Sequence, residues 1–387
     1  MSAQRKGTSM AEHGGFLIQG RFGEVGNFEL VVPTQLGGLA HSWRNNDDVS
    51  FSWAGPEWFA AGDIAAASLV QSTFGDNLEV VFRQGARLAH CYRTFTANGH
   101  GPWSVPTEFA SGVAGHPSLV QSPGPLNRNF EVVAPLTAGG IGHWFRDNNN
   151  PALPWAGPQV FATELGAVAA VALIHSDLGD DLEVVARAGD VLVLYWRQAG
   201  AWNGPLPFFM GASGAPGFVQ SRHGGRGNFQ VVTPLGAGGM AHLWRDNDDP
   251  AQPWRHEATF GAGAVGAASV VHSRLAGATS SLEVAARVGR DTQVWYRQDL
   301  DGSTWTLGAI APAEPFRDPI TEGQWRVPCT SGVVGVHAAL LRTGRVLFFT
   351  YHEPWNEMSH VGTSAVLDPV TGIVSDHMPH TRDLFCG

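Results

Sequence analysis

The chain has 387 residues, of which 43% are hydrophobic and 15% are charged, so it contains enough apolar material for a large folded core. Its formal net charge of −10 argues against the basic surface that nucleic acids and anionic membranes require. Its three cysteines, Cys91, Cys329 and Cys386, are too widely spaced for a disulfide framework or a paired metal motif.

Residues 1–14 carry charges with no apolar run behind them, and we expect this segment to be flexible. The sequence therefore predicts neither a signal peptide nor a membrane span. We expect no membrane insertion and a cytoplasmic location for the chain as written, with secretion by another route as the alternative. Beyond this segment, 49 glycines and 24 prolines are spread along the chain, which is typical of many short strands joined by tight turns.

From residue 15 onward the chain repeats itself. The clearest marker is an anchor strand, an apolar run with a polar second residue, as in Phe28-Glu29-Leu30-Val31-Val32. Its first residue recurs after 50, 52, 52, 47 and 53 residues, at Phe28, Leu78, Phe130, Leu182, Phe229 and Leu282. A period near 50 residues is typical of the blades of a β-propeller or a related array.

Each repeat contains four predicted strands. The first ends in a polar pair such as Gln71-Ser72, the anchor strand is second, the third ends in an aromatic residue and Arg, and the fourth follows a Trp. The aromatic-Arg pairs are Trp43-Arg44, Tyr92-Arg93, Phe145-Arg146, Trp196-Arg197, Trp244-Arg245 and Tyr296-Arg297. Four strands make one propeller blade, so the sequence predicts an all-β ring of six blades over residues 15–312.

The repeats alternate in kind. The first, third and fifth have Phe at the start of the anchor strand and an Asn/Asp-rich run after the Arg, whereas the even repeats have Leu and lack that run. This alternation indicates that a two-blade unit was copied.

The His two residues before the aromatic residue, as in His41, suggests a metal or catalytic role. Leu194 and Val294 take its place in the fourth and sixth repeats, so we interpret it as core packing. No metal-binding spacing of His is present. We interpret the Arg as the partner of the anchor-strand acid, so that Glu29 and Arg44 form a structural pair, since an Arg fork bonds carboxylates and amide oxygens.

The Asn/Asp-rich loops of the odd repeats are the predicted ligand site. Short amides and carboxylates next to an exposed indole suit a sugar, whose hydroxyls need polar partners and whose C–H face packs on an aromatic ring. Alternatively these residues cap turns, or their carboxylates bind calcium, although the spacing does not match an EF-hand loop. The candidate residues are Arg44, Asn46, Asp47, Trp53, Asp147, Asn148, Trp155, Asp246, Asn247 and Trp254.

The aromatic-Arg strand, the following Trp and the Leu78-Glu-Val-Val81 type of anchor resemble the repeats of PLL-like and tectonin-type β-propeller lectins. The resemblance covers about residues 15–312. It implies that sugars bind at several equivalent pockets formed by or between blades, through Trp, Arg and small polar residues. The Asn/Asp-rich loops in alternate repeats depart from that pattern.

The tail, residues 313–387, differs from the repeats. Thr343-Gly344-Arg-Val-Leu-Phe-Phe349 resembles the opening blade of the kelch-type propeller in galactose oxidase and glyoxal oxidase relatives. By position, Cys386 resembles the cysteine that those enzymes cross-link to a Tyr, while Tyr351, His352 and His360 match no copper ligand of that family. We favour a tail that docks as a seventh blade over a truncated second domain, since an isolated hairpin this apolar would aggregate.

These observations predict a multivalent carbohydrate-binding propeller that recognises neutral sugars, with glycans as partners, no cofactor, no metal and no catalytic activity. The alternatives are a targeting module or truncated relative of a copper-radical oxidase, and a propeller that binds only proteins.

Overall fold

The computed structural model describes residues 14–312, except 97–98, 123–127, 180, 276–280 and 299–302, together with parts of 337–380. The chain divides into two compact units, residues 1–315 and 316–387. The flexibility expected of residues 1–14 falls almost entirely outside the described residues. Within the described part, no helix is long and apolar enough to span a membrane.

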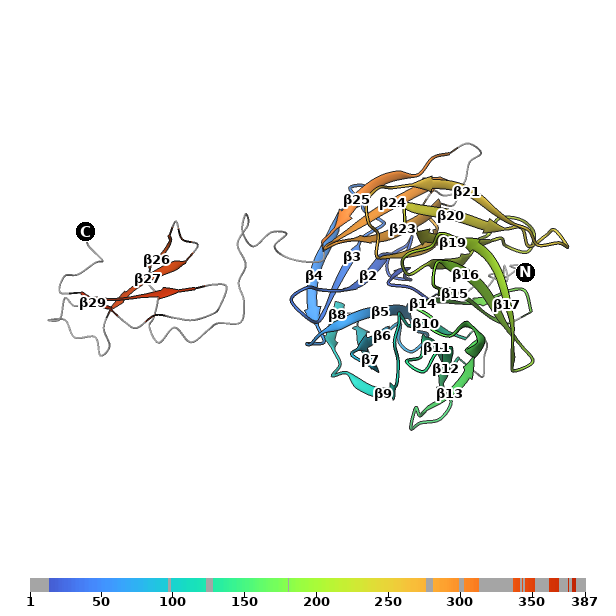
Figure 1. The fold of residues 1–387 in the computed structure, drawn as a ribbon, viewed down its shortest axis with the longest axis horizontal. Helices are drawn as coiled ribbons and strands as arrows, with labels where there is room; N and C mark the ends of the chain where they lie inside the picture. Colours follow the sequence, from blue (N-terminus) through green and yellow to red (C-terminus); the bar gives the residue numbers. More distant parts are fainter. Residues whose placement is uncertain are drawn as a thin grey trace, which may run out of the picture. The chain divides into compact units, whose positions relative to one another are not determined.

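The first unit is a ring of six antiparallel blades, as the repeats predicted (Figure 1). Strand order in each blade follows the sequence from the centre outward, and in the second blade β8 and β9 both pair with β7. The blades are β1 (Leu17–Gln19), β2 (Phe28–Pro33), β3 (Leu39–Arg44) and β4 (Trp53–Phe59); β5 (Ile64–Gln71), β6 (Leu78–Gln84), β7 (Arg87–Thr96), β8 (Gly99–Trp103) and β9 (Thr107–Ser111); β10 (Ser118–Gln121), β11 (Phe130–Pro135), β12 (Ile141–Arg146) and β13 (Trp155–Phe161), followed by the 3-10 helix η1 (Thr163–Leu165). The remaining three blades are β14 (Ala170–Ser176), β15 (Asp181–Ala188), β16 (Val191–Gln198) and β17 (Ala201–Met210); β18 (Gly217–Gln220), β19 (Phe229–Pro234), β20 (Met240–Arg245) and β21 (Trp254–Phe260); β22 (Ala267–Ser273), β23 (Ser281–Val288), β24 (Asp291–Gln298) and β25 (Thr306–Ala311).

The ring closes between its first and sixth blades. The backbone N–H of Leu17 donates to the Ser269 hydroxyl at 3.1 Å, and the N–H of Arg274 donates to the Gln19 side chain at 2.9 Å. These contacts leave no gap for another blade in the ring. The expectation that the tail completes the ring as a seventh blade is therefore wrong, because six blades already bury each other's faces.

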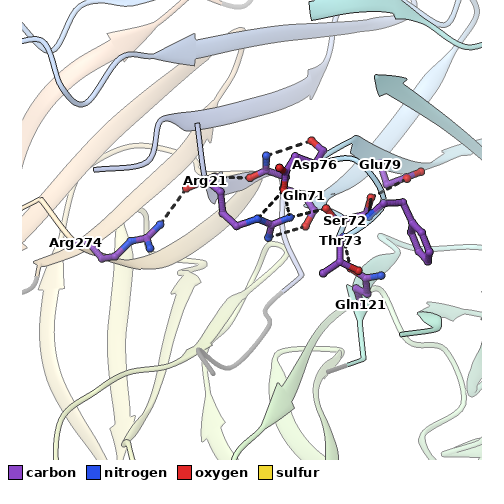
Figure 2. A network of polar contacts seen from close by, with 10 residues as sticks. Arg21, Gln71, Ser72, Thr73, Asp76, Glu79, Gln121 and Arg274 are labelled. Atoms are coloured by element: carbon purple, nitrogen blue, oxygen red, sulfur yellow. Dashed lines mark hydrogen bonds and ion pairs between the residues drawn. The ribbon is translucent and has the colours of Figure 1, made fainter. Parts of the chain in front are cut away.

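The polar pair at the end of each first strand joins neighbouring blades. Gln71 accepts a hydrogen bond from the N–H of Arg21 in the preceding blade, and Gln121 accepts one from Thr73 (Figure 2). Figure 2 also shows the Arg21 guanidinium bonded to Ser72 and Asp76, so the loops after the first strands are tied together from one blade to the next. The repeated pair thus has a role in ring assembly beyond marking a strand end.

Backbone from Gly14 and Gly15 fills the centre of the ring. The N–H of Gly14 donates to the Leu173 carbonyl at 2.8 Å, and the Gly15 carbonyl accepts from Leu69 at 2.6 Å. A Cβ atom at Gly14 would lie 2.2 Å from the Ser118 hydroxyl and 2.7 Å from a backbone oxygen. Only glycine permits this close approach to the innermost strands.

The second unit contains a four-stranded antiparallel sheet in sequence order, β26 (His337–Leu340), β27 (Val346–Tyr351), β28 (Gly362–Leu367) and β29 (Met378–His380). Four strands in this order agree with a blade-like sheet. Cys386, His352 and His360, the residues on which the oxidase comparison depends, lie outside the described residues.

We predict that Gly14→Ala lowers the free energy of unfolding of the ring by about 1–3 kcal/mol, because the added methyl group clashes with packed backbone. Urea unfolding followed by Trp fluorescence measures the change. Gly236→Ala is the matched control, since no atom lies within 4 Å of a Cβ built there and it should stay within about 0.5 kcal/mol of the parent. Equal stability of the two variants would contradict the packing of Gly14 at the ring axis.

Candidate functional site

Each blade has two faces, and these faces meet different neighbours. Across β2 and β3, Phe28 lies opposite Arg44 and Glu29 lies opposite Trp43. Directly opposite residues share a face and adjacent residues do not. Arg44 and Glu29 therefore point to opposite sides of the first blade, and the expected pairing of the two within one repeat is wrong.

The buried acid of the anchor strand is bonded instead by the His of its own third strand. The Nε2 atom of His41 lies 2.8 Å from Glu29, and both side chains are fully buried. The interpretation of this His as part of the core is consistent with that burial. Within the described residues no group of three His, Cys, Asp or Glu side chains is arranged to hold a metal ion. The equivalent pairs are His90 with Glu79, His143 with Glu131 and His242 with Gln230, at 2.7–2.8 Å.

In the second and sixth blades the Arg contacts the blade before it. Arg93 of the second blade has its Nη1 atom 3.1 Å from the free ring nitrogen of His41 and 2.7 Å from the Glu57 carboxylate. Arg297 of the sixth blade repeats the arrangement, 3.2 Å from His242 and 2.7 Å from Glu257. We call these two clusters the Arg–Glu sites.

The Arg of an odd blade is held within its own blade. Arg44 donates from Nε to Asn46 at 2.9 Å, and the Asn46 amide donates to the Gly26 carbonyl at 2.6 Å. The guanidinium also lies 4.3 Å from the centre of the Phe28 ring, so the Phe that distinguishes odd repeats stacks on this Arg. The same contacts join Arg146 to Asn148 and Phe130, and Arg245 to Asn247 and Phe229.

The aspartates predicted to bind ligand shape loops. Asp47 accepts backbone hydrogen bonds from Glu24 and Val25, both at 2.8 Å, and so braces the loop between the first two strands. Asp147 and Asp246 accept N–H groups from their own turns, at 2.9 Å and 3.1 Å. These contacts are the turn capping that was the alternative interpretation of the Asn/Asp-rich runs.

The three tryptophans predicted as exposed platforms are half-buried between blades. Trp155 stacks on Phe109 at 4.0 Å and Trp254 stacks on Phe208 at 4.0 Å, while Trp53 packs against the apolar cluster that joins the first and sixth blades. One face of Trp155 and one face of Trp254 is therefore covered by a ring from the preceding blade. The loops thus place the predicted residues next to one another, with the Arg, Asn and Asp side chains in contacts within a blade and the Trp rings between blades.

The Arg–Glu sites bring together residues that the sequence prediction missed. The Glu57 side chain is 44% exposed while Arg93 behind it is 6% exposed, and Glu257 and Arg297 are 36% and 16% exposed. The half-buried Trp244 adds an indole N–H that donates to Glu257 at 3.1 Å. Each site thus presents a solvent-facing carboxylate paired with a less exposed guanidinium, which is buried in Arg93 and half-buried in Arg297. The sequence did carry a signal for these sites, an acid near the end of the fourth strand of the repeat. Glu57 lies two residues before Phe59, and Glu257 lies three residues before Phe260.

The hydrogen bonds define the protonation of the first Arg–Glu site. Arg93 can only donate, so the Nδ1 atom of His41 accepts and its Nε2–H donates to Glu29. Burial raises the pKa of Glu29 to about 8, with His100 and Arg93 opposing that rise. Burial, aided by the positive charge of Arg93, lowers the pKa of His41 to about 3, so the imidazole is neutral at physiological pH. In the other site, the hydrogen bond from Arg297 holds the pKa of Glu257 below its usual value.

Comparison with solved structures finds propeller lectins. The BP39L lectin of Burkholderia pseudomallei matches with a TM-score of 0.53 and 16% identity over 74% of this chain and 81% of that one. The six-bladed fucose-recognising lectin of Aleuria aurantia matches with a TM-score of 0.54 and 13% identity over 78% of this chain and 96% of that one. A periplasmic gluconolactonase of Pseudomonas aeruginosa matches with a TM-score of 0.46 and 14% identity, over 96% of each chain.

No protein-family model and no curated protein sequence matches the chain. At identities of 13% and 16%, the likeness to the two lectins shows the fold of the ring. The chain is similar to six-bladed β-propeller lectins as a class, and the PLL-like or tectonin type is not distinguished within that class.

We predict that Glu29→Gln stabilises the ring increasingly as pH rises. The folded-state pKa of about 8 exceeds the ordinary value of 4.5, so the unfolded chain releases this proton first and parental stability falls between about pH 4.5 and pH 8. At pH 8 the variant should be more stable by about 2 kcal/mol, with the difference vanishing near pH 4. Urea unfolding across this range measures it. Gln230→Glu is the reciprocal control, because it adds a buried carboxyl group, and its unfolding free energy should fall faster with rising pH than that of the parent. A decline no faster than that of the parent would contradict the argument.

We also predict that Gly20→Ser is more stable than Gly20→Ala by about 0.5–1.5 kcal/mol. A Cβ at this position lies 3.0 Å from the Oε1 atom of Gln71 in both variants, so the difference reports the hydroxyl. The Oε1 atom of Glu29 is buried without a hydrogen-bond partner among the described residues. Ser72 supplies that partner to Glu79 in the second blade at 3.1 Å, and Gly20 stands in the corresponding position of the first. Denaturant unfolding compares Gly20→Ser with Gly20→Ala, which adds the Cβ without the hydroxyl. No advantage of Ser over Ala would show that Glu29 does not use the new donor.

Proposed function

We propose that the ring is a multivalent lectin that binds neutral sugars at its two Arg–Glu sites, without catalysing a reaction on them. The observation that carries the proposal is the repeated pairing of a solvent-facing carboxylate with a less exposed guanidinium, in Glu57 with Arg93 and in Glu257 with Arg297. The similarity of the ring to propeller lectins supports the choice of ligand class.

The chemistry of the sites suits a pair of adjacent hydroxyl groups. A carboxylate accepts hydrogen bonds from sugar hydroxyls, and the remaining guanidinium hydrogens donate to sugar oxygens. Trp43 and Trp244 are half-buried on the same face of their blades as the His, where an aromatic ring can pack on the C–H face of a sugar. Because Arg93 and Glu57 carry opposite charges, the site favours a ligand without net charge.

In this proposal the loop residues predicted from the sequence have a supporting role. Asn46, Asn148 and Asn247 orient the Arg of the odd blades, and Asp47 fixes the loop next to it. Trp53, Trp155 and Trp254 fill the space between blades. The ligand contacts belong to the alternate interfaces, between the first and second blades and between the fifth and sixth.

Two weak sites on one ring are sufficient for binding a surface that carries many glycans. Once one site is engaged, the second encounters its sugar at a high effective concentration, and the avidity exceeds either single affinity. Glycan-bearing surfaces are therefore the proposed partners.

We predict that the double variant Glu57→Ala/Glu257→Ala lowers affinity for neutral sugars at least tenfold, because it removes the hydroxyl acceptor from both sites. A tenfold loss corresponds to about 1.4 kcal/mol. Calorimetric titration with fucose, its methyl glycosides and other neutral monosaccharides measures it, fucose first because the Aleuria aurantia lectin recognises it.

The control is Glu108→Ala, which removes an exposed carboxylate that pairs with the exposed Arg87 and belongs to neither Arg–Glu site. It should bind sugar like the parent. Failure of the parent protein to bind any neutral sugar would refute the proposed function, and undiminished binding by the double variant would refute the assignment of the sites.

A further inference from the structure

The interface between the third and fourth blades has the same framework as the Arg–Glu sites. Trp202 stacks on Phe161 at 4.0 Å and meets the edge of His143 at 5.5 Å. In the first Arg–Glu site, Trp103 stacks on Phe59 at 3.9 Å and meets His41 at 5.5 Å. The stacked Trp and the His edge are thus shared by the two interfaces.

The polar group on the outer strand differs. Glu57 lies opposite His41 across β3 and β4, and Gln159 lies opposite His143 across β12 and β13. The carboxylate that pairs with the even-blade Arg is thus replaced by an amide. The Gln159 amide donates to the Gly200 carbonyl at 3.3 Å.

The even-blade Arg of this interface, Arg197, consequently lacks an anionic partner. Within the part of the chain that the structure describes, no hydrogen bond or ion pair engages its guanidinium, and its Nε–H is buried without an acceptor. Glu131, the nearest acid of the framework, is engaged by His143 at 2.7 Å and by Ser122 at 3.2 Å. In the first Arg–Glu site the equivalent Nε–H donates to the Gly101 carbonyl of its own blade, and the terminal nitrogen Nη1 is the one that bonds Glu57. A ligand carboxylate would therefore bond the terminal nitrogens of Arg197.

We propose that the interface between the third and fourth blades binds a sugar that carries a carboxylate, which takes the place that Glu57 and Glu257 occupy in the other two. The proposal rests on the proposed function, since it assumes that sugars enter these interfaces. A carboxylate matches the guanidinium fork in shape and charge, and Phe145, which is 39% exposed, stands in the position of Trp43. The ring therefore combines two sites for neutral sugars with one for an acidic sugar.

The test compares methyl β-glucuronide with methyl β-glucoside, which differ only in a carboxylate or a hydroxymethyl group at C6. Calorimetric titration of the parent protein should show at least a tenfold preference for the glucuronide, with one acidic site per chain and weaker binding at high salt. The methyl glycoside of N-acetylneuraminic acid, titrated in parallel, distinguishes a sialic acid from a uronic acid as the source of the carboxylate.

Reciprocal variants locate the site. Gln159→Glu supplies the missing carboxylate and should lower glucuronide affinity at least tenfold, whereas Glu257→Gln removes one and should raise the number of acidic sites from one to two. Arg197→Met removes the guanidinium of the proposed site. Its control is Arg87→Ala, which removes a positive charge elsewhere, from an exposed Arg paired with Glu108. Thermal unfolding confirms that each variant is folded.

Equal affinity for the two glycosides, no binding of any acidic sugar, or unchanged glucuronide binding in folded Gln159→Glu would each overturn the proposal. These outcomes are separable from failure of the proposed function. Neutral sugars would still bind at Glu57 and Glu257 if only the acidic site were wrong. Conversely, loss of all neutral-sugar binding with retained, Arg197-dependent glucuronide binding would refute the neutral sites alone.

Discussion

A polar group buried at the second position of the anchor strand determines how the blades meet. Glu29 is fully buried, and a carboxylate in such a place is costly unless its oxygens are bonded or its proton is retained. The first solution is local, because His41 lies on the same face and donates to it. The second comes from the next blade, whose Arg93 bonds the far side of that imidazole. This chain of contacts fixes one blade against the next and places a guanidinium at the edge of the interface.

The alternation of the repeats divides the six interfaces into two kinds. Where the Arg comes from an odd blade, its own Asn and Phe satisfy it, as Asn46 and Phe28 satisfy Arg44, and the interface is devoted to packing. Where the Arg comes from an even blade, no such Asn is present. In Arg93 and Arg297 the Nε–H bonds a carbonyl of the same blade, while the terminal nitrogens bond the His and the Glu of the preceding blade. Two interfaces of the second kind carry an exposed carboxylate, Glu57 in one and Glu257 in the other, so the candidate sites are fewer than the blades.

The sequence was sufficient to predict the six-bladed ring but not the side-chain pairs that join its blades. Blade number, strand order and the two-blade alternation follow from local patterns that recur every 50 residues or so. Glu29 and Arg44 looked like partners because they lie in one repeat, yet adjacent positions on a strand face different neighbours. The true partners are separated by a whole repeat, as with Arg93 and His41. The place of Glu57 also depends on an irregularity in the pairing of β3 with β4 between His41 and Trp43, which the sequence does not reveal.

The side chains that hold these interfaces together are buried, whereas the position that varies from one interface to another lies near solvent. The His and its anchor-strand partner are buried in every odd blade, and changing them disturbs the contact between blades. The outer-strand position lies nearer solvent, where Glu57 is 44% exposed, and Gln159 stands there in the third blade without any change in the ring stacking behind it. A substitution at this one position alters the charge offered to a ligand while the framework stays intact. Duplication of a two-blade unit, followed by a substitution at the exposed position, would therefore let one ring acquire sites of different charge preference with little disturbance of the packing between blades.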